Sequence, residues 1–229
     1  MIEIASRAPP PVLAIDGPGG AGKGTISRLA AERLNWHYLD SGALYRILAL
    51  AGKLKGIALS DESALSDIAS KLDIRFGTGS DERIWLESSE ITDQIRTEQA
   101  GAAASAVAAL PAVRAALLER QRAFRRMPGL VADGRDMGTV VFTDAIVKVF
   151  LTASAQERAD RRYKQLIAKG IDVKLCDLLA DIQTRDDRDS NRAIAPLRPA
   201  ADAVLIDTSS MSIDEVLQKV LGLVDLQTS

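Results

Sequence analysis

Short apolar runs rich in β-branched residues alternate along the chain with longer segments whose apolar residues recur at helical spacing. The first pattern predicts buried strands, and the second predicts amphipathic helices. We expect strands at residues 12–16, 36–39, within 128–134, at 146–151 and at 203–207. We expect helices at residues 25–34, 42–54, 97–109, 112–126, 154–168, 173–190 and 212–224. Alternating strands and helices favour a parallel sheet covered on both faces, so the predicted fold class is α/β with a three-layer core.

Two stretches depart from this alternation. Residues 72–76 and 83–87 have the pattern of two short strands joined by a polar, glycine-containing turn at 77–82, which predicts a small β insert. Residues 1–11 end in three consecutive prolines, and we expect them to form a flexible extension. The remaining residues, 12–229, are expected to form a single domain.

The composition is that of an ordinary globular protein. Of 229 residues, 47% are hydrophobic and 26% are charged, and the formal net charge is −2. A protein that follows nucleic-acid backbones usually carries a basic excess, so we expect no nucleic-acid partner. The N-terminus has no apolar stretch long enough for a signal peptide, and the apolar segment 100–110 is too short to cross a membrane. We therefore expect a cytoplasmic protein without a membrane partner.

The chain has a single cysteine, Cys176, and a single histidine, His37. One cysteine excludes an internal disulfide and a cysteine-based zinc site, and it fits a reducing compartment. One histidine excludes a metal site built from several histidines. His37 lies beside aromatic residues, and we interpret it as a strand residue rather than a catalytic one.

Glycine is concentrated directly after the first predicted strand. The spacing from Gly17 to Gly22 and Lys23 matches the phosphate-binding pattern G-x4-G-K, with a predicted helix behind it. Such glycines let consecutive backbone N–H groups point at phosphate oxygens, the helix start adds positive potential, and the lysine supplies a charge. The flanking strand and helix argue against a chance match. We expect nucleotide binding by Gly17, Pro18, Gly19, Gly20, Ala21, Gly22, Lys23, Gly24 and Thr25.

The predicted helix at 173–190 carries an apolar stripe that becomes ionic toward its end. The stripe consists of Leu175, Leu178, Leu179 and Ile182. The same face continues with Arg185, Asp186 and Asp189, and related spacing includes Arg188 and Arg192. One interpretation is a solvated helix end with internal ion pairs. The other is an arginine cluster facing a phosphate-binding cleft, because arginine binds phosphate bidentately.

Two further charged groups accompany this helix. Arg158, Arg161 and Arg162 lie on the predicted helix 154–168, where Arg158 and Arg162 share a face. Asp133, Arg135 and Asp136 follow a predicted strand at its C-terminal end. Ligands of open parallel sheets bind at that end, although Asp133 before a glycine also fits a simple turn residue.

Four segments together resemble the bacterial cytidylate kinases: GPGGAGKGT, LDSGALYR, ADGRDMGTVVF and RDDRDSNR. The resemblance spans about residues 12–224 and preserves the order of the segments. It implies a P-loop kinase core with a monophosphate-binding insert at about 60–110 and a lid at about 155–170. It also implies transfer of the γ-phosphoryl group of ATP to CMP or dCMP with the help of Mg²⁺.

The same resemblance implies roles for individual residues. The catalytic cations would be Lys23, Arg135, Arg158 and Arg162. The acceptor phosphate would be held by Arg46 and Arg135, and the ribose approached by Ser105, Arg185 and Asp189. The cytosine would be surrounded by Ser41, Arg114, Asp136 and Arg192. By chemistry, the carboxylate of Asp136 suits the cytosine amine, while Arg114, Ser41 and Arg192 suit its acceptor atoms.

Phosphoryl transfer to a monophosphate needs no general base, because the attacking oxygen is already anionic, so a chain with one histidine is adequate. Magnesium is expected to sit among phosphates and water, with Thr25 or Asp133 as candidate contacts. Alternatives are another small-acceptor P-loop kinase, such as a shikimate-type or other monophosphate kinase, or a nucleotide-binding regulatory module. The chain lacks the N-K-x-D segment that guanine-binding regulatory modules usually carry. Its net negative charge disfavours a DNA-binding ATPase. We expect a monomer with small-molecule substrates.

Overall fold

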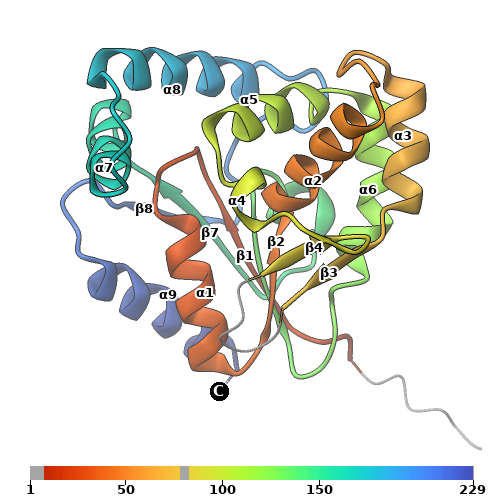
Figure 1. Cartoon of the computed structure of the whole chain (residues 1–229). Helices are drawn as coiled ribbons and strands as arrows, with labels where there is room; N and C mark the ends of the chain where they lie inside the picture. The colour runs from red at the N-terminus through yellow and green to blue at the C-terminus, as the bar shows by residue number, and fades with distance from the viewer. Residues whose placement is uncertain (1–7, 78–82, 229) are drawn as a thin grey trace, which may run out of the picture.

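The computed structural model describes residues 8–77 and 83–228. In this part of the chain, five parallel strands form one sheet in the order β2-β6-β1-β7-β8 (Figure 1). The strands are β1 (Val12–Asp16), β2 (His37–Asp40), β6 (Leu130–Gly134), β7 (Val147–Thr152) and β8 (Val204–Asp207). Each predicted strand of the core is confirmed, and the predicted parallel sheet follows from their register.

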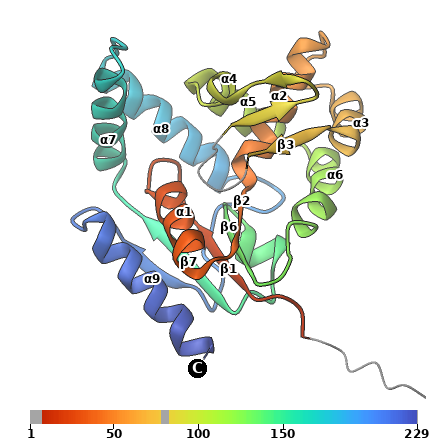
Figure 2. The same ribbon diagram turned by 60° about the horizontal axis from the view of Figure 1, so that its bottom comes forward.

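The helices of the core are α1 (Lys23–Leu34), α2 (Ser41–Leu54), α6 (Pro111–Arg122) and α9 (Ile213–Thr228). Side chains of β1 alternate between two hydrophobic cores, because successive residues of a strand point to opposite faces. Leu13 and Ile15 pack with α1 and α9, whereas Val12 and Ala14 pack with residues of α2 and the segment after β6. Figure 2 shows α1 and α9 on one side of the sheet and α2 and α6 on the other. The predicted three-layer core is therefore confirmed.

The predicted β insert is present and larger than expected. An antiparallel sheet joins β3 (Ile74–Phe76), β4 (Ile84–Leu86) and β5 (Ser89–Glu90). It packs with α3 (Glu62–Lys71), α4 (Thr92–Ile95) and α5 (Glu98–Val107) in a hydrophobic core to which α2 and α6 also contribute. The turn predicted at 77–82 lies outside the described residues except for Gly77.

Several predicted boundaries shift. Pro111 is the first residue of α6, as its fixed φ favours, but α6 ends at Arg122 rather than at residue 126. The helix predicted at 173–190 is α8 (Leu175–Ser190), and the one predicted at 154–168 is α7 (Ala155–Ala168). The extension predicted at 1–11 lies outside the described residues as far as residue 7.

A π-helical turn, η1 (Met137–Val141), follows β6 and has no counterpart in the sequence prediction. The carboxylate of Asp16, at the end of β1, accepts hydrogen bonds from the backbone N–H groups of Met137 and Gly138, both at 2.8 Å. This contact joins the ends of two neighbouring strands and fixes the start of η1.

The helices α7 and α8 pack against each other beyond one end of the sheet (Figure 1). Within the described residues, no single helix is long and apolar enough to cross a membrane. The pair α5 and α6 meets that criterion by length and composition only when joined, with a bend of 104° between them.

Candidate active site

A cavity of about 730 Å³ opens at the carboxyl ends of β1, β2 and β6, where open parallel sheets bind ligands. Its walls come from the loop before α1 and from helices α2, α5, α6, α7 and α8. The predicted site residues that line it are Gly19, Gly20, Lys23, Ser41, Arg46, Ser105, Arg114, Asp133, Arg135, Asp136, Arg158, Arg162, Arg185, Asp189 and Arg192. Those outside the lining are Gly17, Pro18, Ala21, Gly22, Gly24 and Thr25.

The glycine loop has a backbone shape that other residues would strain. Gly17 has a φ of 147°, and a Cβ built on it would lie 2.0 Å from the carbonyl oxygen of Leu151. Gly20 has a φ of 82° and lies beneath the side chain of Arg158. Gly22 precedes the first residue of α1, Lys23, so the loop leads directly into the positive end of that helix. A glycine loop that leads into the start of a helix has the shape that the predicted phosphate binding requires.

Lys23 is buried against this loop. Its Nζ donates to the carbonyl oxygen of Pro18 at 2.8 Å and lies 3.9 Å from Oδ1 of Asp133. Burial lowers the pKa of Lys23, the positive charge of Arg135 lowers it further, and Asp133 opposes both. Burial likewise raises the pKa of Asp133, which also hydrogen-bonds with Tyr38. The lysine charge is thus held away from water, where an added anion would strongly favour the protonated form of Lys23.

A magnesium ion would find few protein ligands here. Among the described residues, no cluster of three or more histidine, cysteine, aspartate or glutamate side chains could hold a metal. Thr25 is half-buried at the start of α1, and Asp133 already faces Lys23. The donor set fits an ion that takes most of its oxygens from phosphates and water.

The segment after β6 directs its charged residues to different partners. Arg135 donates through Nε to Oδ2 of Asp189 at 3.0 Å. Asp136 forms a buried ion pair with Arg114 of α6. Arg135 and Asp136 therefore connect the sheet to two helices on different walls of the cavity.

Asp189 is the centre of a second buried group. It accepts hydrogen bonds from Ser105 at 3.2 Å, from Arg135, and from Arg192. Burial opposes ionisation of Asp189, but the neighbouring arginines outweigh burial and hold its pKa below the usual value. The ionic end of the α8 stripe therefore faces the cavity, as one of the two sequence interpretations requires. Within the stripe Leu178 is buried, whereas Arg188, outside the stripe, lines the cavity but is exposed.

The cluster retains donors that protein groups do not use. The Nε atoms of Arg185 and Arg192 are buried without a hydrogen-bond partner among the described residues. Burial lowers the pKa of Arg185 to about 10, and repulsion from Arg135 contributes. Burial also lowers the pKa of Arg46 and Arg192. Positive charge in excess of its carboxylates makes this wall suited to a bound anion.

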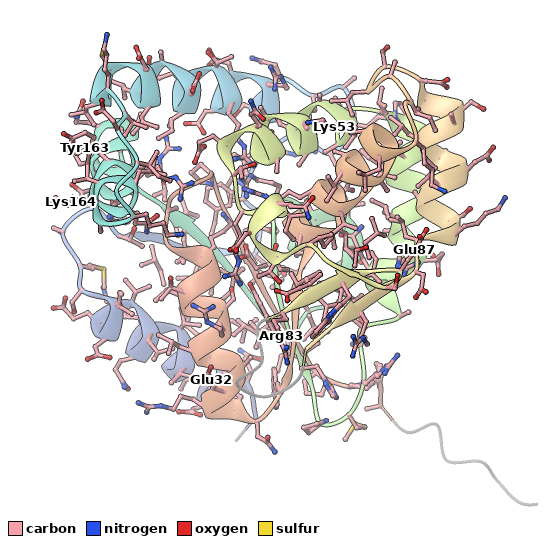
Figure 3. The ribbon with its side chains drawn as sticks, viewed as in Figure 1. Glu32, Lys53, Arg83, Glu87, Tyr163 and Lys164 are labelled. Atoms are coloured by element: carbon pink, nitrogen blue, oxygen red, sulfur yellow. The ribbon has the colours of Figure 1, made fainter. Side chains whose placement is uncertain are left out.

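Two arginines of α7, Arg158 and Arg162, line the cavity and pair with other elements. Arg158 donates to the carbonyl oxygens of Gly19 and Ala153, each at 3.0 Å, and forms an ion pair with Asp186 of α8. Arg162 pairs with Glu98 of α5. Lys164 lies on the side of α7 that faces away from the sheet (Figure 3). Arg161 also points elsewhere, because it bonds with Glu157 and Thr208.

Gln121 of α6 is a residue of this region that the sequence interpretation missed. Its Oε1 accepts the hydroxyl proton of Ser41 at 2.8 Å. In this structure the one proton of Ser41 is directed at Gln121, and the expected contact of Ser41 with acceptor atoms of a base stays a prediction. Gln121 could have been noticed: with Arg114 and Leu117 it forms a buried stripe at helical spacing, in which glutamine is out of place.

His37 is exposed on β2, and its Nε2 lies 2.9 Å from the carbonyl oxygen of Met127. Neither His37 nor the exposed Cys176 lines the cavity. The interpretation of His37 as a strand residue is confirmed.

Among solved structures, a gluconokinase from Sinorhizobium meliloti 1021 superposes with a TM-score of 0.50 and 16% sequence identity. The match covers 97% of this chain and 96% of the gluconokinase. At this identity the likeness shows the fold alone, a P-loop kinase core.

Sequence comparison goes further. The chain is 62% identical over 214 residues to the cytidylate kinase of Pseudomonas paraeruginosa (strain DSM 24068 / PA7), with 92% of this chain and 93% of that protein covered. It is 60% identical over 214 residues to the cytidylate kinase of Methylococcus capsulatus (strain ATCC 33009 / NCIMB 11132 / Bath), with 93% and 96% covered. The family model for cytidylate kinase matches residues 13–226. Together, the family model over residues 13–226 and these relatives at 60% identity or more show that the chain belongs to the cytidylate kinase family.

Proposed function

We propose that the cavity binds ATP at the glycine loop and a pyrimidine monophosphate at its opposite end, with the reacting phosphates meeting between them. As a cytidylate kinase, the enzyme transfers the γ-phosphoryl group of ATP to CMP or dCMP and yields ADP with CDP or dCDP. One observation carries the division into two ends. Within four residues, the end of β6 and the segment after it connect Asp133, beside Lys23, with Asp136, beside Arg114.

At the donor end, residues 17–25 bind the phosphates of ATP. Their backbone N–H groups and the start of α1 supply positive potential, and Lys23 supplies a full charge. A phosphate oxygen would replace the carbonyl of Pro18 as the partner of Lys23 Nζ. Magnesium, when bound, neutralises phosphate charge, and Thr25 and Asp133 are the residues that would hold it directly or through water.

At the acceptor end, the arginine-rich wall binds the monophosphate. Arg46 and Arg135 hold its phosphate, and Ser105, Arg185 and Asp189 approach the ribose. Support comes from the buried Nε donor of Arg185 and from the position of Asp189 among three arginines. Ser41, Arg114, Asp136 and Arg192 surround the base, where Asp136 accepts a hydrogen bond from the exocyclic amine.

The chemistry requires positioning and charge neutralisation. The attacking phosphate oxygen of CMP is anionic, so no residue has to remove a proton. Lys23, Arg135, Arg158 and Arg162 offset the negative charge that spreads over the transferred group. Helix α7 with its two arginines forms the lid, at about residues 155–170, and excludes water that would otherwise hydrolyse ATP. The insert at about 60–110 forms the wall for the monophosphate.

We further propose that the enzyme works as a cytoplasmic monomer on small molecules, without a nucleic-acid or membrane partner. The single exposed cysteine and the slightly acidic charge balance support this setting.

A coupled ADP-release assay with a panel of acceptors tests the proposal. The panel contains CMP, dCMP, UMP, AMP, shikimate and no acceptor, each with ATP and magnesium. We expect the highest kcat/KM with CMP or dCMP and little ADP release without an acceptor. Preference for AMP or shikimate, or equal ADP release without any acceptor, would contradict the assignment of the acceptor end.

A further inference from the structure

A buried hydrogen-bond chain lies behind the wall that surrounds the base. Ser41 begins α2 and lines the cavity, whereas Gln121 of α6 lies behind it and does not. Both are almost fully buried, with 3% and 2% of their surface exposed. Ser41 Oγ lies 2.8 Å from Gln121 Oε1, and Gln121 Nε2 lies 3.3 Å from the carbonyl oxygen of Leu117. The chain thus runs from a backbone carbonyl through an amide to a hydroxyl at the cavity surface.

The chemistry of these groups fixes the direction of each proton. A backbone carbonyl can only accept, so the amide nitrogen of Gln121 must face Leu117. Its oxygen then faces Ser41 and also can only accept, so the Ser41 hydroxyl must donate its one proton to Gln121. The lone pairs of Ser41 Oγ remain for whatever occupies the cavity. Ser41 therefore presents an acceptor there.

Asp136 presents acceptors to the same cavity. It is buried and paired with Arg114 through Oδ2, and a carboxylate offers a ligand only acceptor atoms when ionised. Ser41, Tyr45, Arg114 and Asp136 all line this one cavity, and the charges of Arg114 and Asp136 act in opposite directions on the pKa of Tyr45. A base edge that carries an N–H₂ group satisfies two such acceptors, because an amine has two protons. A carbonyl oxygen satisfies neither.

We infer that Gln121 is a specificity-determining positioning residue, which fixes Ser41 as a hydrogen-bond acceptor and so favours cytosine, with its exocyclic amine, over uracil. The inference rests on the proposed placement of the base beside Ser41 and Asp136. Without Gln121, the Ser41 hydroxyl can rotate and donate to a carbonyl oxygen, so discrimination by this group is lost.

The experiment compares kcat/KM for CMP and for UMP at saturating ATP and magnesium. The main variant is Gln121→Leu, which removes the acceptor and keeps a similar volume. We expect the CMP/UMP ratio to fall about tenfold, because a uracil oxygen gains a donor from Ser41 while cytosine loses an oriented acceptor. The KM for ATP should stay unchanged. Gln94→Leu, at an exposed position outside the cavity, is the matched control and should keep the ratio.

Two further variants separate this inference from the proposed function. Ser41→Ala should lower the CMP/UMP ratio, and the double variant should match Ser41→Ala because Gln121 acts through that hydroxyl. If Ser41→Ala leaves the ratio unchanged, the proposed base position is wrong.

If Ser41→Ala lowers the ratio but Gln121→Leu reduces CMP and UMP turnover equally, Gln121 is only structural and the inference is overturned. Should Gln121→Leu not fold, Gln121→Met is measured in its place with the same criteria. A fall in the thermal midpoint alone, with the ratio intact, also counts against the inference.

Discussion

At the scale of single residues, the cavity contains charges that are buried and held by protein partners. Lys23 is held between the carbonyl of Pro18 and the carboxylate of Asp133, and burial lowers its pKa. A buried cation of this kind is costly to the fold unless a ligand uses it. The proposed contact of Lys23 with the phosphates of ATP would give this buried charge a use in the reaction.

Replacing Lys23 with methionine should therefore separate function from folding. We expect Lys23→Met to fold normally and to lower kcat at least about a hundredfold, equivalent to about 2.7 kcal/mol. The variant lacks the positive charge that would offset the negative charge of the transferred phosphoryl group. Thermal unfolding and steady-state kinetics measure the two effects. Lys164→Met, on the outer side of α7, is the control and should keep kcat (Figure 3). A folded Lys23→Met variant with near-normal turnover would refute the phosphate role.

Asp136 provides the corresponding test at the base. Asp136→Asn removes the charge that pairs with Arg114 and supplies an amide that can donate. The kcat/KM for CMP should fall by about 1.5 to 3 kcal/mol, the range for a lost charge-assisted hydrogen bond, and UMP should lose much less. The ratio of the two values is the measured quantity. If CMP and UMP fall by the same factor, Asp136 acts by orienting Arg114 and does not contact the amine.

At the scale of elements, Asp16 connects β1 to the turn η1. Its two carboxylate oxygens each accept one backbone N–H, from Met137 and from Gly138. The residues that precede this turn, Arg135 and Asp136, therefore depend on Asp16 for their position. Burial raises the pKa of Asp16 to about 7, above its ordinary value of 3.8, although the two backbone hydrogen bonds oppose the increase.

This shift predicts a dependence of stability on pH. Because the folded state binds the Asp16 proton more tightly than the unfolded state, its contribution to the free energy of unfolding falls as pH rises from 3.8 to about 7. Asp16→Asn cannot titrate, so the thermal midpoint of wild type relative to this variant should decrease as pH rises from about 5 to 7.

The same variant should also lower kcat/KM for CMP about tenfold, because an amide cannot accept both N–H groups. Asp202→Asn, at an exposed ion pair, is the control, and parallel midpoint curves for Asp16→Asn would exclude the shift.

Elements whose signals are local could be predicted from the sequence. The strand β1, the glycine loop and α1 are contiguous, and each has a distinct residue pattern. The contacts of Asp16 and Gln121 could not be predicted, because their partners are distant in the sequence. Met137 lies 121 positions from Asp16, and Ser41 lies 80 positions from Gln121. The short β5 and the turn η1 have no periodic pattern, because tertiary packing determines them.

At the scale of the whole molecule, the described residues form three hydrophobic cores. The insert shares one with α2 and α6, and the two faces of the main sheet pack in the others. Polar contacts join the parts across the cavity: Arg158 links α7 to the glycine loop and α8, and Asp189 links α8 to α5 and to the segment after β6. Helices joined in this way can move relative to the sheet while each core stays intact.

Arg158 tests this arrangement. Arg158→Lys keeps the charge but loses the fork of donors that reaches both Asp186 and the loop carbonyl of Gly19. We expect kcat to fall about tenfold or more, with faster amide hydrogen exchange in α7, because the lid loses its connections. Arg126→Lys, at an exposed position, is the control. Unchanged exchange in α7 together with normal turnover would show that Arg158 does not hold the lid.

The anchoring of the segment between β6 and η1 has a consequence for insertions and deletions. Parallel pairing with β1 fixes Gly134 at one end, and the carboxylate of Asp16 fixes Met137 at the other. Only Arg135 and Asp136 lie between these anchors, and they pair with residues of two different helices, α8 and α6. One added residue would have to bulge into the space for the nucleotide, and one removed would leave a wall without its charge. The length of this segment, more than the identity of its neighbours, should therefore be invariant among working descendants of this chain.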